Sequence, residues 1–206
     1  MLIMSFLMVG TGGGLPSTPA KPLALAEHGM LQCWSPDPTK KTCRVIASYR
    51  KTGPATYDNK AIVGLSDQGP ITVETHTPVE IRGDAVCGPV RIQDIRTGIL
   101  RKGKEIVSSA DAQPILDRVA AIMAPLDGQE TCTRYDASGG KLTAKVSIAG
   151  SYRPEHDAEV KWISPSDGYS ATPQEFDDRE ANPLMSVLGR QQTLARTPQP
   201  PLSGGA

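Results

Sequence analysis

The sequence has few aromatic residues, no net charge and only a short apolar run at its start. Phe, Trp and Tyr make up 4% of the 206 residues, so Val, Ile, Leu and Ala must fill most of the interior. The charges of the 22 basic and 22 acidic residues cancel, so the composition shows no excess of positive charge that would favour binding to nucleic acid or to an anionic membrane. The run LIMSFLMVG is far below the roughly 20 residues that span a bilayer. We therefore expect neither a nucleic-acid partner nor a transmembrane helix.

Familiar catalytic and cofactor-binding motifs are also missing. The patterns G-x-S-x-G, H-E-x-x-H and the calcium loop do not occur. Residues 98–104 have the glycine and lysine spacing of a phosphate-binding loop, but Glu105 stands where a Ser or Thr should hold magnesium. We therefore expect no cofactor and no metal, and we favour a protein that is not an enzyme.

The start of the chain indicates export. The apolar run is followed by the small-residue triplet Ala24-Leu25-Ala26, which is typical of a signal-peptide cleavage site. No Lys or Arg precedes the run, and a misassigned start codon would explain that departure. We predict that residues 1–26 are a signal peptide and that the mature protein is periplasmic or secreted; a permanent membrane anchor is the weaker alternative.

Four cysteines lie in the middle of the chain: Cys33, Cys43, Cys87 and Cys132. They indicate an oxidising compartment and a domain held by two disulfides. Four cysteines allow three pairings, among which the sequence does not choose, although proximity favours Cys33–Cys43 and Cys87–Cys132. The C-x-x-C and Cys/His spacings of zinc sites are absent, so metal binding by these cysteines is the weaker alternative.

Several segments alternate apolar and polar residues with a period of two, as strands buried on one face do. The clearest runs from Lys141 to Arg153, and residues 158–162 follow it after a turn, which predicts an antiparallel hairpin. In residues 71–82, Pro78 interrupts the alternation and indicates an edge strand or a bulge. Shorter strands are expected at 43–49 and 61–65, with a small hairpin at 99–107.

One segment has the apolar spacing of a helix. Ile115, Leu116, Val119 and Ile122 recur at helical spacing, which predicts an amphipathic helix over about 112–125. We therefore expect an α+β fold, a mostly antiparallel sheet with this helix packed on it and stabilised by disulfides. The single domain is expected over residues 27–173, because residues 174–206 are rich in Pro, Gln and Gly and read as a disordered tail.

Histidines offer the remaining candidates for a polar site. His76 lies near Glu74 on the polar side of its strand, and His156 lies in a turn beside Asp157. A carboxylate beside a histidine can orient or charge it, although a solvated surface has the same appearance and no paired nucleophile is in view. A hydrolase would be favoured if both histidines and two or more acidic residues met in one cleft, and that interpretation fails if they are scattered.

A resemblance is carried by the segments GMLQCWSPDPTKKTCRVIASYRKTGPATYDNKA, AVCGPV, CTRYDASGG and KWISPSDGY. They resemble a group of uncharacterised exported bacterial proteins of alphaproteobacterial type, over most of residues 29–173. The resemblance supports the leader, the paired cysteines and the start of the tail, and it carries no activity or binding residues.

The favoured function is therefore a non-enzymatic binding or structural domain of the cell envelope or periplasm. Its partner would be a small ligand, a glycan or an envelope protein, bound on the polar sheet face or on the loop between Cys33 and Cys43. The alternative is a small exported hydrolase with an unrecognised site around His76 or His156.

Overall fold

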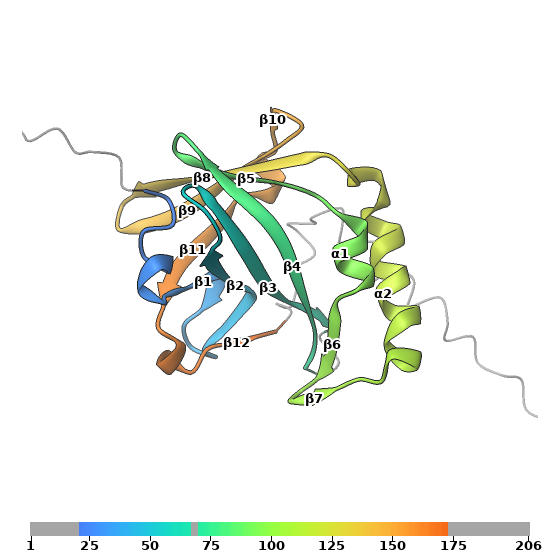
Figure 1. Ribbon diagram of the computed structural model, residues 1–206. Helices are drawn as coiled ribbons and strands as arrows, with labels where there is room; N and C mark the ends of the chain where they lie inside the picture. Colours follow the sequence, from blue (N-terminus) through green and yellow to red (C-terminus); the bar gives the residue numbers. More distant parts are fainter. Residues whose placement is uncertain (1–20, 67–69, 173–206) are drawn as a thin grey trace, which may run out of the picture.

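Eight strands pair edge to edge until the sheet closes on itself (Figure 1). The computed structural model describes residues 21–66 and 70–172. The barrel strands are β1 (Leu31–Asp37), β2 (Thr42–Lys51), β3 (Thr56–Ser66), β4 (Ile71–Arg82), β5 (Ala85–Pro89), β8 (Glu130–Ser138), β9 (Lys141–Ile148) and β11 (Ala158–Ile163). All neighbours in this ring are antiparallel, and β3 closes it because it pairs with both β2 and β4.

The expected α+β fold, a mostly antiparallel sheet with one helix packed on it, is therefore wrong: the fold is a closed eight-stranded antiparallel barrel. The physical reason is that alternation marks one buried face, whether that face is covered by a helix or curls round to cover itself. The closing contacts are distant in the chain, such as Leu31 beside Ile163. Local patterns do not report such pairings.

The small elements lie at the ends and edges of the barrel. They are η1 (Ala26–His28), α1 (Ile92–Arg96), β6 (Ile99–Lys102), β7 (Glu105–Ile106), α2 (Ser109–Met123), η2 (Ala124–Leu126), β10 (Ser151–Tyr152), η3 (Pro154–His156), η4 (Pro165–Asp167) and β12 (Ser170–Ala171). The predicted hairpin at 99–107 is confirmed as β6 and β7, with Gly103 supplying the positive φ of the turn. None of the helices in residues 21–66 and 70–172 has the length and apolar character to cross a membrane.

The C-terminal hairpin is confirmed with one correction. β9 and β11 pair antiparallel, as the alternation predicts. The expected strand 141–153 is not continuous, because Ala149 and Gly150 adopt positive φ angles of 49° and 77° and turn the chain into β10. Gly tolerates such a φ without a steric cost, and a two-residue turn of this kind joins antiparallel strands.

The predicted helix is confirmed as α2, although it begins at Ser109, before the expected start at about residue 112. Ser108 caps it by accepting a hydrogen bond from the backbone N–H of Asp111, which satisfies one of the free amides of the first turn. Ala112 and Leu116 pack with Val73 and Leu100. The helix thus buries its apolar side against β4 and β6, beside α1 (Figure 1).

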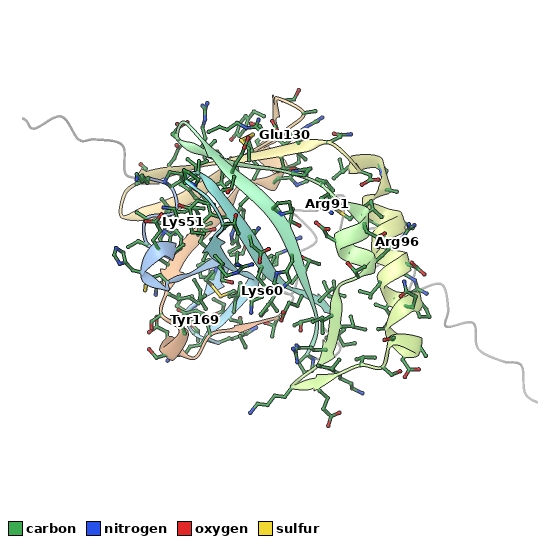
Figure 2. The ribbon with its side chains drawn as sticks, viewed as in Figure 1. Lys51, Lys60, Arg91, Arg96, Glu130 and Tyr169 are labelled. Carbon is green, nitrogen blue, oxygen red and sulfur yellow. A yellow bond between two sulfur atoms is a disulfide. The ribbon has the colours of Figure 1, made fainter. Side chains whose placement is uncertain are left out.

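Both favoured disulfides are present. Cys33–Cys43 joins β1 to β2, and Cys87–Cys132 joins β5 to β8, where the two residues are direct partners in the strand register. The second bond therefore ties the strand before α2 to the strand after it, as expected. Nearby on the same surface, Arg82 of β4 donates to Glu130 of β8 at 2.8 Å (Figure 2).

The segment before β1 closes one end of the barrel. Leu23 is 1% exposed and Ala26 is 7% exposed, and both pack with Tyr57 and Val86. Glu27 accepts hydrogen bonds from Lys51 and Tyr57 at 2.8 and 2.7 Å. Cleavage after Ala26 would remove Leu23 and Ala26 from this cluster, and the signal peptide over residues 1–26 remains a prediction. The predicted tail, residues 174–206, lies outside the described residues, as do residues 1–20 of the predicted leader.

Candidate binding cavity

The inner face of the barrel is polar over one stretch. Tyr49, Asn59 and Thr77 are partners across β2, β3 and β4, so their side chains share the inner face. Thr131 and Thr133 of β8 pair with Gly88 and Val86 of β5 and reach the same space. These polar side chains surround a hollow where a barrel of this size would otherwise be filled by apolar side chains.

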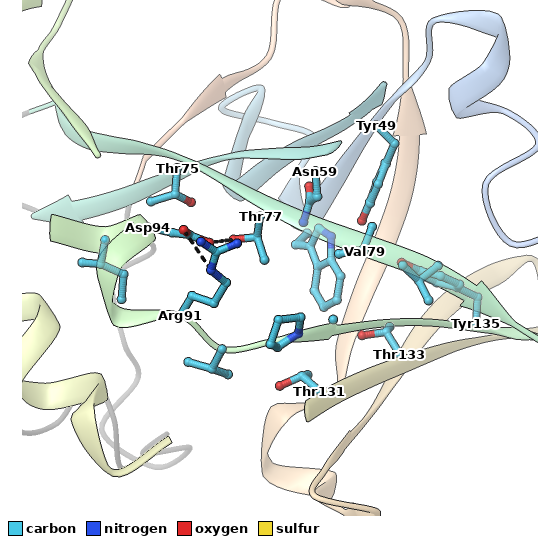
Figure 3. A pocket seen from close by; sticks show the side chains of 16 residues that line it. Tyr49, Asn59, Thr75, Thr77, Val79, Arg91, Asp94, Thr131, Thr133 and Tyr135 are labelled. Carbon is cyan, nitrogen blue, oxygen red and sulfur yellow. Dashed lines mark hydrogen bonds and ion pairs between the residues drawn. The ribbon is translucent and has the colours of Figure 1, made fainter. Parts of the chain in front are cut away.

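The hollow is a cavity of about 310 Å³ (Figure 3), near the lower end of the ~300–1,000 Å³ that is usual for small-ligand sites. Its walls come from seven segments of the fold and combine threonines, aromatic rings and a few aliphatic side chains. The lining residues are Trp34, Tyr49, Asn59, Thr75, Thr77, Val79, Val86, Gly88, Pro89, Val90, Arg91, Asp94, Ile95, Thr131, Thr133 and Tyr135.

One wall occupies a gap between two strands. β5 pairs with β4 at residues 80–82 and β6 pairs with β4 at residues 71–74, and α1 lies between them with Arg91, Asp94 and Ile95 on the cavity. The N–H of Ile92 donates to Asp127 at 3.0 Å, which anchors the start of α1. Pro78, which has no N–H, lies in the stretch of β4 between these two pairings, so the predicted local edge is confirmed there.

Gln32 organises the aromatic part of the cavity wall. It is fully buried, and its Oε1 accepts hydrogen bonds from Tyr49 at 2.8 Å, Tyr135 at 3.1 Å and the Trp34 indole at 3.4 Å. Burial, with Tyr135 close by, raises the pKa of Tyr49 well above its ordinary value. Tyr49 therefore stays neutral and remains a donor, so one amide oxygen holds three rings in fixed positions.

An ion pair lies at the α1 side of the cavity. Thr77 donates to Oδ2 of Asp94 at 2.9 Å, and Nε of Arg91 lies 3.3 Å from Oδ1 (Figure 3). The Asp94 side chain is 11% exposed, whereas that of Arg91 is 46% exposed. They are the two charged residues of the cavity lining, so the lining carries no net charge.

Two buried polar atoms among the described residues have no hydrogen-bond partner. They are Nε2 of Gln32 and Oδ1 of Asn59. An unpartnered buried polar group costs about 1–3 kcal/mol. Asn59 lines the cavity, so a ligand there would reach its amide, and rotation of that amide would present either its oxygen or its nitrogen.

The sequence-predicted polar candidates lie elsewhere. His76 is on the outer face of β4, with Nδ1 at 3.2 Å from Asp58 and Nε2 at 3.7 Å from Glu74. His156 is the last residue of η3, which lies against β9. Strands β5 and β8 stand between β9 and β4, the strand of His76. The structure therefore brings His76 and Glu74 together but places His156 on another part of the surface.

Asp157 braces β11 against β9. Its carboxylate accepts from Lys145 at 2.7 Å, from Tyr152 and from the backbone N–H of Val146. Burial by itself would raise the pKa of Asp157, but these hydrogen bonds outweigh it, and the pKa lies below its ordinary value. Each partner belongs to β9 or β10, so Asp157 has a structural role: it ties the start of β11 to these two strands.

One group with metal-ligand chemistry occurs within the described ranges, and it consists of Cys87, Glu130 and Cys132. The two sulfur atoms are bonded to each other. A disulfide sulfur is not the thiolate that metals require, so this group offers a single carboxylate.

Comparisons with protein-family models, with curated proteins and with solved structures gave no match to this chain. The resemblance to exported alphaproteobacterial proteins therefore stays a prediction.

The inner polar residues are functional candidates that the sequence interpretation missed. In β4, Thr75 and Thr77 share the parity of the apolar residues Val73 and Val79, so two threonines interrupt the buried row. Thr131 and Thr133 repeat this pattern in β8. Polar residues at the inward-facing positions of two strands were the pattern in the sequence that could have indicated this site.

Proposed function

We propose that this protein binds a small molecule inside its barrel. The supporting observation is a cavity of about 310 Å³ on the inner face, lined by threonines and by rings that Gln32 holds in position. The interior of an eight-stranded barrel is either filled by side chains or wide enough to hold one small ligand. A few placed polar groups among apolar ones are what ligand sites use to fix orientation.

Export is part of the proposal. The two disulfides are compatible with an extracellular or periplasmic location, since such bonds persist in oxidising compartments. The expected ligand surfaces were the polar sheet face and the loop between Cys33 and Cys43. The cavity now replaces them in the proposal, because polar groups from several strands line one hollow there.

The hydrolase alternative receives no support from a shared cleft. His76 contacts carboxylates on the outer face, and His156 belongs to η3. The proposal is therefore a binding protein.

Two tryptophans provide the test. Trp34 lines the cavity, whereas Trp162 packs in the apolar cluster with Leu23 and Tyr57. Titration of the protein with a library of small metabolites should find compounds that quench tryptophan fluorescence saturably. The quenching should disappear in Trp34→Phe and persist in Trp162→Phe.

A matched threonine pair locates the binding. Thr133 faces the cavity, whereas Thr143 of β9 is paired with Glu159 on the outer face. Thr133→Val removes one hydroxyl with little change in shape and should weaken a hit about 2- to 10-fold, the worth of one hydrogen bond. Thr143→Val should leave its affinity unchanged. A library without saturable hits, or hits that Thr133→Val and Thr143→Val affect equally, would contradict the proposal.

A further inference from the structure

We propose that the ligand is neutral and rich in hydroxyl groups, a monosaccharide or a comparably small sugar. This inference rests on the proposed function and adds the chemical class of the ligand. Three properties of the cavity carry it: its balance of charge, its hydrogen-bonding groups and its aromatic wall.

The charges favour a neutral ligand. Arg91 and Asp94 neutralise each other at 3.3 Å, and Thr77 gives the carboxylate a further hydrogen bond. An anionic ligand would have to displace Asp94 from Arg91 and would face a carboxylate that is 11% exposed. A cationic ligand would meet the guanidinium of Arg91 in the same place. Like charges held close together repel each other, so either kind of ion would bind less tightly than a neutral ligand.

The hydrogen-bonding groups favour a ligand with many hydroxyls. Thr75, Thr77, Thr131 and Thr133 line the cavity beside Asn59. A threonine hydroxyl can donate one hydrogen bond and accept two, and an amide offers both functions. Sugar hydroxyls have the same double capacity, so they can match this lining without a fixed pattern. An apolar ligand would bury these groups without hydrogen-bond partners, which weakens binding.

The aromatic wall suits a sugar ring. Trp34 lines the cavity together with Asn59 and Val79, and its Nε1 donates to Oε1 of Gln32 at 3.4 Å. Because Gln32 takes the N–H on the edge of the ring, we expect the flat surface of the indole to be the part that packs on the ligand. A sugar ring carries its C–H bonds on a face that packs on an aromatic ring, while its hydroxyls project from the edge toward polar side chains.

The first experiment compares matched ligands on the whole protein. Glucose and galactose differ from glucuronate and galacturonate by one carboxylate, and indole is an apolar compound of similar size. Titration calorimetry with tryptophan fluorescence should show at least one neutral sugar binding, about tenfold or more tighter than its uronate. Indole should bind weakly.

A change of charge supplies the second readout. Asp94→Asn keeps an oxygen that accepts from Thr77 but leaves Arg91 without its counter-charge, so the lining gains one positive charge. The affinity of the uronate relative to its neutral sugar should rise about tenfold or more. Asp117→Asn is the control, because Asp117 is an exposed aspartate of α2 near Arg96, outside the cavity.

The outcomes separate the two proposals. If indole or a uronate binds at Trp34 while neutral sugars do not, the sugar proposal is wrong and the binding function stands. If neutral sugars bind but Asp94→Asn does not change their preference over uronates, Arg91 and Asp94 do not set the ligand charge and the inference is overturned. If neither the panel nor the wider metabolite library quenches Trp34, both proposals fail.

Discussion

Strand β4 carries polar residues on both faces, and the two faces use them differently. Outside, His76 is half exposed and contacts Asp58 and Glu74. Such exposed pairs exchange easily with water and contribute about 0–1 kcal/mol. Inside, Thr77 donates to the mostly buried Asp94, where each group depends on its protein partner. A polar residue at an inward-facing position of a strand therefore indicates a functional site more strongly than a polar residue at an outward-facing position.

The largest expected effect comes from the covalent link on the outer face. Cys87→Ala/Cys132→Ala should lower the free energy of unfolding by about 4 kcal/mol, because the disulfide restricts a long loop of the unfolded chain. The Cys33–Cys43 disulfide closes a shorter loop, so Cys33→Ala/Cys43→Ala should lower the free energy of unfolding by about 3 kcal/mol. Urea denaturation measures both. A larger loss for the shorter loop would show that packing around Cys33, which is fully buried, outweighs chain entropy.

Replacing one polar residue by Leu on each face should give the next largest difference in the free energy of unfolding. Gln32→Leu leaves Tyr49, Tyr135 and Trp34 without their common acceptor and should cost about 3 kcal/mol, the sum of several unpartnered buried donors. His76→Leu removes exposed contacts and should change the free energy of unfolding by less than about 0.5 kcal/mol. Urea denaturation again provides the measurement. Equal losses would remove the distinction between the inner and outer polar residues.

The smallest expected effect is a pH dependence at the rim of the barrel. Hydrogen bonds from Lys51 and Tyr57 lower the pKa of Glu27 from 4.5 to about 2. A lowered carboxylate pKa stabilises the folded state above the unfolded pKa, and this contribution is lost as pH falls from 4.5 toward 2. Glu27→Gln should therefore lose less stability than wild type between pH 5 and pH 2.

The control for this effect is Glu155→Gln, because Glu155 is an exposed glutamate of η3. Glu130 and Asp157, whose pKa values are also lowered, remain in both variants. Urea denaturation at several pH values measures the difference. A Glu27→Gln variant that follows the pH dependence of Glu155→Gln would show that the contacts of Glu27 do not stabilise the fold.

Much of the secondary structure could be predicted, because its signals are local. The alternation from Lys141 onward gave β9, and the spacing of Leu116 and its neighbours gave α2. The disulfides followed from proximity along the chain. The five-residue helix α1 was missed, since it is too short for helical periodicity to stand out.

The candidate site could be predicted far less well. Trp34 and Tyr135 are about a hundred positions apart in the sequence and meet at Gln32. The sequence predicted a polar site at His76 because a carboxylate lies near it in the chain. It gave no such reason for Thr75 and Thr77, because threonine is common in strands of every kind. Their importance comes from the side of the sheet that they occupy.

By itself, the sequence determined which residues alternate and where α2 forms, because these depend on short-range geometry, and it favoured the two disulfides without fixing their pairing. Only the tertiary structure decided that β1 meets β11 and that β5 meets β8. These long-range pairings turn one face of the sheet into an interior. They make Asn59 and the threonines, which are ordinary strand residues in the sequence, part of the lining of one cavity, because the inward-facing side chains of neighbouring strands lie on the same side of the sheet.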